Sequence, residues 1–146
     1  MKIEAEIPTR AMIVNGGFAC KATARGEKAS KPDFGDYNDK KGVYIFHADG
    51  KLLYIGKTTD GEFGNFRERL YRHLSESASV NSRVHKLLMA QTKPTKAYLL
   101  DLRDVDMMIN PGAITLDDVS KALIMEQILI GVFRPIGNVI KGADEA

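Results

Sequence analysis

The chain has 146 residues, of which 44% are hydrophobic and 27% are charged, a composition that indicates one folded domain and excludes a disordered chain. No stretch reaches the ~20 uninterrupted apolar residues that a membrane span needs, and the first residues lack the apolar core of a signal peptide. Cys20 is the only cysteine, which excludes an internal disulfide and a zinc site built from several cysteines. We therefore expect a cytoplasmic protein with no membrane partner.

The charge is unevenly distributed although the net charge is only +2. Residues 51–100 carry nine Lys and Arg against four Asp and Glu, whereas residues 101–146 carry four against eight. A basic middle and an acidic end can place a positive face on one side of the domain, which would suit a polyanion such as nucleic acid. A solvated surface of uneven charge explains the same pattern equally well.

The first 41 residues predict little regular structure. Residues 2–7 alternate weakly and residues 11–14 form a short apolar run, so either segment can be a strand. The Asn-Gly-Gly sequence at residues 15–17 is expected to end the second of them. Residues 28–41 are polar and predict a connector.

The remainder of the chain predicts strands and helices in the order β-β-α-α-β-α, which is typical of a small α+β structure. Turn residues separate two β-rich runs, Asn65 can cap the first helix, and apolar side chains recur at helical spacing in both of the first two helices. The expected elements are strands at residues 43–47, 51–55 and 96–102, a helix that begins at Phe66 with Leu70 and Leu74 inward, a helix from Asn81 or Ser82 to about Gln91 with Val84, Leu87 and Leu88 inward, a loop at residues 104–115, and a helix at residues 117–133.

The register of the first hairpin decides where two tyrosines lie. A two-residue turn at residues 49–50 would pair Tyr44 with Ile55 and place Tyr54 on the opposite face. A three-residue turn at residues 48–50 with a bulge would instead pair Tyr44 with Tyr54, so that both hydroxyls project from one face. We expect the second register, because the glycine of the turn then occupies the left-handed position.

Three other side chains carry potential chemistry. Arg69 and His73 are four residues apart and share a helix face beside the apolar stripe, so we expect both at the rim of whatever this helix packs against. The three histidines of the chain show no metal-ligand spacing. Glu126 falls in the middle of an apolar arc of the last helix, formed by Val119, Ala122, Leu123, Leu129 and Ile130.

A carboxylate at the centre of an apolar face costs several kcal/mol unless a charge compensates it. Either a buried arginine or a bound divalent cation would compensate Glu126, and the helix alone favours neither.

Four motifs in order resemble those of the GIY-YIG nuclease family. The similarity extends over residues 42–140 and ends in Asn138, twelve residues after Glu126, as in the glutamate helix of that family. The motifs are Gly42-Val43-Tyr44, then after nine residues Tyr54-Ile55-Gly56, followed by Lys57-Thr58, the segment 66–73 and the segment 126–138.

The resemblance implies a three-stranded antiparallel sheet flanked by helices, which forms a nuclease domain over residues 42–140. Residues 1–41 would then be an N-terminal extension, and residues 141–146 an acidic tail. Because no separate zinc finger or helix-turn-helix is present in the sequence, the extension and the insertion at residues 61–65 are the candidates for reading a DNA sequence.

The resemblance also implies an activity, which is metal-dependent hydrolysis of a DNA phosphodiester by in-line attack of an activated water. Glu126 would hold one Mg²⁺ or Mn²⁺, and Tyr44 would position or deprotonate the water. Tyrosine has an ordinary pKa of ~10, so we expect a nearby cation, Lys57, to lower the pKa of Tyr44.

The remaining implied roles concern phosphate and structure. Arg69 would neutralise charge on the phosphoryl oxygens, while Tyr54 and His73 would orient water or phosphate. Asn138 would form hydrogen bonds that hold the end of the Glu126 helix. Double-stranded DNA is the expected partner, a homodimer on DNA is a further hypothesis, and the basic residues expected to bind the backbone are Lys57, Arg67, Arg72, Arg83 and Lys86.

Two other functions remain open. A non-catalytic nucleic-acid-binding module on the same scaffold would use the basic face alone. A protein-interaction domain would use Ile124 and Ile128, which we expect to face outward. The joint presence of the two tyrosines with Arg69, His73 and Glu126 favours the nuclease, because binding alone needs no carboxylate in an apolar face.

Overall fold

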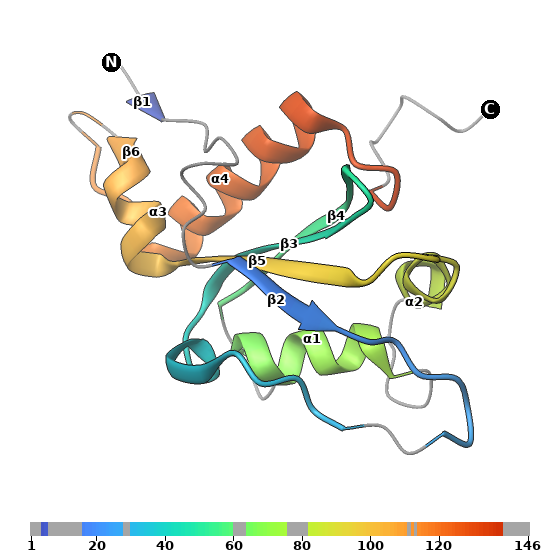
Figure 1. Ribbon diagram of the computed structural model, residues 1–146. Helices are drawn as coiled ribbons and strands as arrows, with labels where there is room; N and C mark the ends of the chain where they lie inside the picture. The colour runs from blue at the N-terminus through green and yellow to red at the C-terminus, as the bar shows by residue number, and fades with distance from the viewer. Residues whose placement is uncertain are drawn as a thin grey trace.

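A computed structural model describes residues 4–5, 16–27, 30–59, 64–75, 82–110, 112 and 114–138. Its centre is an antiparallel sheet with the strand order β2-β5-β3-β4, and a separate short pair joins β1 to β6 (Figure 1). The strands are β1 (Glu4–Ala5), β2 (Gly16–Cys20), β3 (Gly42–Ala48), β4 (Lys51–Thr58), β5 (Thr95–Asp101) and β6 (Ile109–Asn110), and the helices are η1 (Gly35–Tyr37), α1 (Phe66–Leu74), α2 (Ser82–Met89), α3 (Leu102–Met108) and α4 (Asp118–Phe133).

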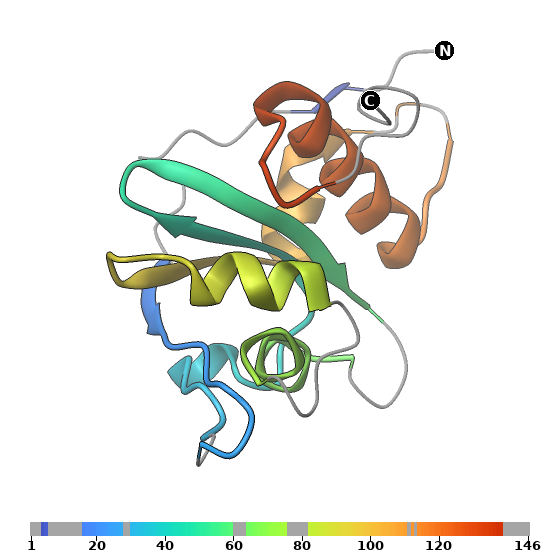
Figure 2. The ribbon, with the colours of Figure 1, turned by 90° about the vertical axis from the view of Figure 1, so that its right-hand side faces the viewer.

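Helices cover both faces of the sheet, with α3 and α4 on one side and α1 and α2 on the other (Figures 1 and 2). The central strand β3 is accordingly buried on both faces, and its alternate residues enter two separate cores. Tyr44 and Phe46 belong to the core under α1, whereas Val43 and Ile45 belong to the core under α4. The predicted α+β fold is confirmed.

The sheet has one strand more than the three expected, because the N-terminal segment contributes β2. This strand begins at Gly16, inside the Asn-Gly-Gly run that was expected to end a strand. The register with β5 shifts between Gly16 and Phe18, and Gly17 has a φ of 79°, so the strand includes both glycines of the expected stop by means of a glycine bulge. The expected strand at residues 11–14 lies outside the described residues.

A helix occupies part of the segment that was expected to be a loop at residues 104–115. The Asp101 side chain accepts a hydrogen bond from the Asp104 backbone N–H (2.9 Å), and the Asp104 side chain accepts one from the Asp101 N–H (3.0 Å). This reciprocal capping box starts α3 directly after β5, and Val105 is fully buried beneath it. The expectation of a loop was wrong because it gave more weight to the later Asn-Pro-Gly sequence than to this pair of aspartates.

The turn between β3 and β4 has two residues, so the expected three-residue turn is wrong. Asp49 and Gly50 both have positive φ, 51° and 75°, as a tight hairpin turn requires. The extra residue lies instead within β4, where the register shifts at Leu53.

As a result, Tyr44 pairs with Gly56 and not with Ile55 or Tyr54. Tyr54 pairs with Phe46. Tyr44 and Tyr54 are therefore diagonal neighbours, and their ring centroids are 6.2 Å apart. The expectation that both rings share one face of the sheet is confirmed.

Within the described residues, no helix has the combination of length and apolar character that crossing a membrane requires.

Candidate active site

Two tyrosines and a histidine pack together between β3, β4 and α1. The Tyr44 hydroxyl lies 2.8 Å from His73 Nε2, and the His73 ring contacts both tyrosine rings, with centroid distances of 5.7 Å to Tyr44 and 5.3 Å to Tyr54. Tyr44 is 2% exposed and His73 is 4% exposed, whereas Tyr54 is half-buried. His73 is thus buried, in contrast to the expected position at the rim, because it reaches inward to the tyrosine.

A glycine in the neighbouring strand makes room for Tyr44. A Cβ atom at Gly56 would lie 2.4 Å from both the hydroxyl oxygen and Cζ of Tyr44. Since no carbon can approach so closely, the Tyr44 ring can lie across β4 only because Gly56 has no side chain. The glycine of the second motif therefore positions the tyrosine of the first.

The residues of α1 present two buried polar atoms that have no partner in the described part of the protein. These atoms are Nε of Arg69 and Nδ1 of His73. Buried polar atoms in native proteins are nearly always hydrogen-bonded, so each marks a position where a ligand or water can bind. The helix thus carries two polar atoms with unused hydrogen-bonding capacity, one of them on the ring that contacts both tyrosines.

Glu126 lies at the border of the buried face of α4, not at its centre. The buried residues of the helix are Ala122, Met125 and Leu129, whereas Val119 and Leu123, expected to be inward, are 37% and 44% exposed. The prediction of the arc was half wrong because apolar residues occur on every side of α4, so that periodicity alone could not orient the helix.

The observed orientation of α4 also corrects the expectation for its other side. Ile124 packs against the core under α4, and Ile128 is half-buried, so neither residue faces outward as expected.

The Glu126 carboxylate is half-buried and has no ion-pair partner among the residues that the structure describes. Among the described residues, its Oε1 accepts a hydrogen bond from Nε2 of the neighbouring Gln127, at 3.2 Å. Burial raises the pKa of the Glu126 carboxyl, and the Gln127 hydrogen bond and the charge of Lys57 oppose this in part. Because no arginine clamps the carboxylate, it is free to bind a cation.

Burial raises the pKa of Tyr44 well above its ordinary value, and the charges of Tyr54 and Glu126 raise it further. The cation that lowers it is Arg69, whereas Lys57 acts on Glu126. The expectation that Lys57 lowers the pKa of Tyr44 is therefore wrong, because burial dominates and Lys57 is directed elsewhere.

The pKa of Tyr54 is raised as well, by burial first and then by the charge of Glu126. The influence of Glu126 on both phenols shows that the carboxylate lies within electrostatic range of them.

His73 is a neutral base at neutral pH. Burial and the positive charges of Arg69 and Arg72 lower the pKa of His73 to about 4. Its imidazole therefore keeps a lone pair that can accept a proton, and the Tyr44 hydroxyl is its hydrogen-bond partner.

Asn138 joins the end of α4 to the middle of β4. Its Oδ1 accepts a hydrogen bond from the Ile55 N–H (2.9 Å), and its Nδ2 donates one to the Ile55 carbonyl (2.8 Å). The preceding Gly137 donates its N–H to the Leu53 carbonyl at 2.7 Å, and a Cβ at this glycine would lie 2.5 Å from that oxygen. The Glu126 helix is thus fastened to the strand that carries Tyr54.

Arg83 occupies a position that the sequence did not reveal. Its guanidinium donates a hydrogen bond to the Gly137 carbonyl, and its charge lowers the pKa of Tyr54 in opposition to burial. It was expected only as a phosphate contact, and no sequence signal links residues 83 and 137. The contact depends on α2 packing beside the end of α4.

The other basic residues expected at DNA differ in exposure and contacts. Arg67 is exposed and its Nε donates to the Pro32 carbonyl at 3.1 Å, Lys86 is exposed on α2, and Lys57 and Arg72 are half-buried. The insertion at residues 61–63, which is part of the proposed sequence-reading segment, lies outside the described residues.

The residues present fit a single divalent cation with oxygen ligands. No group of three or more His, Cys, Asp or Glu that could enclose a metal occurs in the described ranges. Mg²⁺ does not need such a cage, since it is commonly bound through one or two carboxylates together with substrate phosphates and water. The Glu126 carboxylate, which has no ion-pair partner among the described residues, could supply one such ligand.

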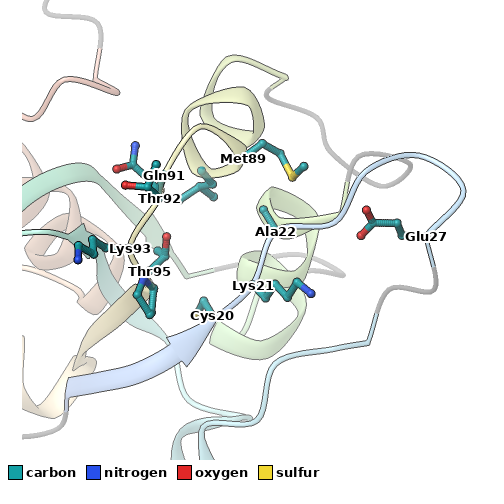
Figure 3. Close-up of a pocket in the computed structure, with 11 residues that line it drawn as sticks. Cys20, Lys21, Ala22, Glu27, Met89, Gln91, Thr92, Lys93 and Thr95 are labelled. Carbon is teal, nitrogen blue, oxygen red and sulfur yellow. The ribbon is translucent and has the colours of Figure 1, made fainter.

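A separate pocket lies at the junction of β2, the end of α2 and the start of β5 (Figure 3). It has a volume of about 390 Å³ and contains none of the predicted site residues. Cys20 lines this pocket, and burial raises the pKa of its thiol to about 12, so the thiol is not a reactive nucleophile.

Comparisons with known proteins agree with the fold. The family described as the GIY-YIG catalytic domain matches residues 40–138. Two solved structures of the GIY-YIG N-terminal endonuclease domain of UvrC from Thermotoga maritima, both point mutants bound to a catalytic divalent cation, are 22% and 23% identical to the chain. Each comparison covers 72% of this chain and 89% of the UvrC domain, with a TM-score of 0.44. A search of curated proteins found no match.

Proposed function

The chain belongs to the GIY-YIG family of catalytic domains, and on this premise we propose that it is a metal-dependent endonuclease that hydrolyses DNA phosphodiester bonds. The proposed nuclease domain comprises residues 42–140, preceded by the N-terminal extension and followed by the acidic tail. Double-stranded DNA is the proposed substrate, and cleavage of both strands would use two copies of the chain or one copy twice.

One observation carries this proposal. The hydroxyl of Tyr44 is 2.8 Å from the neutral imidazole of His73, and the buried Nε of the nearby Arg69 has no hydrogen-bond partner among the described residues. A merely structural core would not leave an arginine atom unpaired, since an unsatisfied buried donor costs about 1–3 kcal/mol. An anionic phosphate would satisfy it.

The proposed reaction begins with proton transfer from the attacking water. The raised pKa of Tyr44 makes the isolated phenol a poor base at neutral pH. His73 removes this difficulty, because Tyr44 can accept the water proton at its oxygen while its own proton passes to His73 Nε2. The water oxygen then attacks phosphorus in line with the leaving oxygen.

Phosphate binding improves the base as well as the electrophile. The charges of Arg69 and Arg72 contribute to the low pKa of His73, and a bound phosphate would compensate those charges. The guanidinium of Arg69 would also stabilise the charge that develops on the phosphoryl oxygens. Tyr54 would orient the water or the phosphate beside Tyr44.

The proposed metal ligand is Glu126, with Mg²⁺ or Mn²⁺ as the cation. When bound, such a cation supplies positive charge at the scissile phosphate and at the leaving oxygen. Asn138 holds the Glu126 helix in place through its two hydrogen bonds to Ile55. Glu126 itself needs no rearrangement to accept a cation, because no described residue forms an ion pair with it.

Backbone contacts to DNA are proposed for Lys57, Arg67, Arg72, Arg83 and Lys86. Arg67 and Arg83 each donate one hydrogen bond to a backbone carbonyl, and a guanidinium has further N–H groups that can reach a phosphate.

The test is a nicking assay on supercoiled plasmid with Mg²⁺ or Mn²⁺, comparing the wild type with Glu126→Gln. Asp118→Asn is the matched control, because it removes an exposed carboxylate from the same helix. Nicking by the wild type and the control but not by Glu126→Gln would support the proposal. Equal nicking by all three would exclude the proposed metal role, and no nicking by any of them would favour the DNA-binding module.

A further inference from the structure

The start of α1 is held by the segment that precedes the first nuclease motif. The Phe66 N–H donates to the Lys40 carbonyl (2.9 Å), and the Arg67 N–H donates to the Asn38 carbonyl (3.2 Å). These N–H groups belong to the first turn, which has no partners within the helix. We define residues 30–40 as the N-terminal strap, which lies alongside α1 (Figure 1) and, except for its last residue, precedes the family match.

The end of α1 is held from the same N-terminal region. The Thr23 N–H donates to the Leu74 carbonyl at 2.8 Å, and Thr23 forms an isolated parallel bridge with Ser75. The last carbonyls of a helix also lack partners within it. Both ends of α1 are thus satisfied by residues from the N-terminal extension.

Side chains fasten the strap to the outer side of α1. Lys31 Nζ lies 2.7 Å from Glu68 Oε1 and 5.8 Å from the centroid of the Tyr71 ring. Arg67 Nε donates to the Pro32 carbonyl. These contacts lie on the side of the helix that faces away from the tyrosines.

The strap is itself anchored in the core. Phe34 is 1% exposed and packs edge-to-face on Phe18, with ring centroids 5.4 Å apart. The Asn38 side chain closes the turn, because its Oδ1 accepts the Phe34 N–H (2.7 Å) and its Nδ2 donates to Asp33 Oδ1 (3.0 Å). The strap is therefore a fixed support rather than a loose connector.

We infer that the N-terminal strap is a positioning element of the active site, which holds α1 so that Arg69 and His73 face the substrate. The inference rests on the proposed nuclease function. A nine-residue helix is too short to be stable alone, so its position depends on what it contacts. Nε of Arg69 has no hydrogen-bond partner in the described part of the chain, so the position of its side chain depends on that of the helix.

The direct test loosens the strap without touching the catalytic residues. Asn38→Ala removes both side-chain hydrogen bonds of the turn. We expect kcat for plasmid nicking to fall about 10- to 100-fold with KM for DNA within about twofold, since small displacements of positioned groups have effects of this size.

A second readout does not depend on cleavage. His73 is faced by Tyr44 and Tyr54 from the sheet and by Arg69 and Arg72 from its own helix. Displacement of α1 would expose the imidazole. The pKa of His73, followed by NMR titration, should therefore move in Asn38→Ala from about 4 toward the ordinary value of ~6.5.

The matched control is Ile109→Val, a loss of one buried methyl group from the core on the opposite face of the sheet. It should lower the melting temperature but leave both kcat and the His73 titration unchanged. If Asn38→Ala does not fold, Lys31→Ala takes its place in the comparison, because it removes the ion pair to Glu68 at an exposed position. We expect the same directions of change in kcat and in the His73 pKa.

Two results would overturn the inference. One is a strap variant with the kcat and the His73 pKa of the wild type. The other is an equal change of kcat and of the His73 pKa in Ile109→Val, which would indicate a general loss of stability. If the wild type does not cleave DNA, the nuclease proposal fails, but the His73 titrations still decide whether the strap positions α1.

Discussion

At the scale of single residues, the site combines groups that are individually costly to bury. Glu126 is a half-buried carboxylate without an ion-pair partner among the described residues, and Arg69 and His73 each have a buried polar atom without a partner. Buried polar groups that serve only the fold normally have hydrogen-bond partners within the protein. In a binding site, some of these groups are left without a partner until the ligand binds. Substitutions at these positions should therefore separate stability from activity.

For Glu126→Gln, we expect the melting temperature of the metal-free protein to equal or exceed that of the wild type, because a neutral group replaces an unpaired charge. Nicking should fall at least about 100-fold. Differential scanning fluorimetry with and without Mg²⁺ should show a stabilising shift in the wild type that is absent from the variant. A metal-dependent shift of equal size in both proteins would contradict the assignment of Glu126 as the ligand.

For Tyr44→Phe, the ring remains and only the hydroxyl that meets His73 is lost. Nicking should fall by about 100- to 10,000-fold, the range for loss of general acid–base catalysis. The free energy of unfolding should fall by about 1–3 kcal/mol, because the buried His73 nitrogen then lacks its partner. Single-turnover kinetics and urea unfolding measure the two effects. If the loss of stability were enough to explain the loss of activity, this would contradict the proposed proton transfer from Tyr44 to His73.

His73 also predicts how stability depends on pH. Its pKa is about 4 in the folded protein and ~6.5 when unfolded, so between these values the unfolded state binds more protons. The free energy of unfolding should therefore fall by about 3 kcal/mol as the pH decreases from 6.5 to 4. Urea unfolding across this range measures the effect, and His73→Gln should flatten this part of the profile. An unchanged profile in the variant would show that another group titrates.

At the scale of elements, the two glycines of the site allow strands and helices to approach. Gly56 admits the Tyr44 ring between β3 and β4, and Gly137 brings the end of α4 against Leu53 of β4. Asn138 then completes the connection by bonding both backbone groups of Ile55. These contacts, made by the residues that follow the last turn of α4, position the helix that carries Glu126.

For Asn138→Ala, both hydrogen bonds to Ile55 are lost. We expect a loss of about 1–3 kcal/mol in the free energy of unfolding, since the Ile55 backbone groups lose their partners. Nicking should fall further than this loss explains, because Glu126 is displaced relative to the tyrosines. Ile136→Ala is the control, since Ile136 is 63% exposed two residues earlier. Wild-type nicking in Asn138→Ala would show that the α4 helix needs no such connection.

At the scale of the whole molecule, the sheet separates two cores, and the N-terminal segment extends the sheet and supports α1. Glu126 belongs to the α4 side and His73 to the α1 side, so the site is assembled at β4, the edge strand of the sheet. For the proposed function, DNA would approach this edge, where Lys57 and the exposed Lys86 could contact phosphates.

For Lys86→Ala, we expect weaker DNA binding at low salt and a log–log salt slope reduced by about 1, as for the loss of one phosphate contact. Fluorescence anisotropy over a salt series measures the slope. Lys121→Ala is the control, because the Lys121 ammonium forms an ion pair with Asp106 between α4 and α3. Equal slopes in the wild type and Lys86→Ala would exclude a phosphate contact at this position.

The sequence alone was sufficient for the family and for the order of β3, β4, α1, α2, β5 and α4, because both follow from local signals. Helix periodicity, the Asn65 cap and the spacing of the tyrosine motifs are all contained in short segments. The errors arose where two local signals compete. A capping box at Asp101 and Asp104 outweighed the following Asn-Pro-Gly, and a glycine bulge lets β2 begin within an expected stop.

Only the tertiary structure decided which face of α4 is buried, which cation faces Tyr44, and what holds α1. A helix with apolar residues on every side has no preferred buried face of its own, so the sheet beneath it selects Ala122, Met125 and Leu129. The pKa of Tyr44 depends on burial between strands that are distant in sequence, and Asn138 meets Ile55 across 83 residues. Contacts of this kind leave no periodicity in the sequence, because they arise only when separate elements pack together.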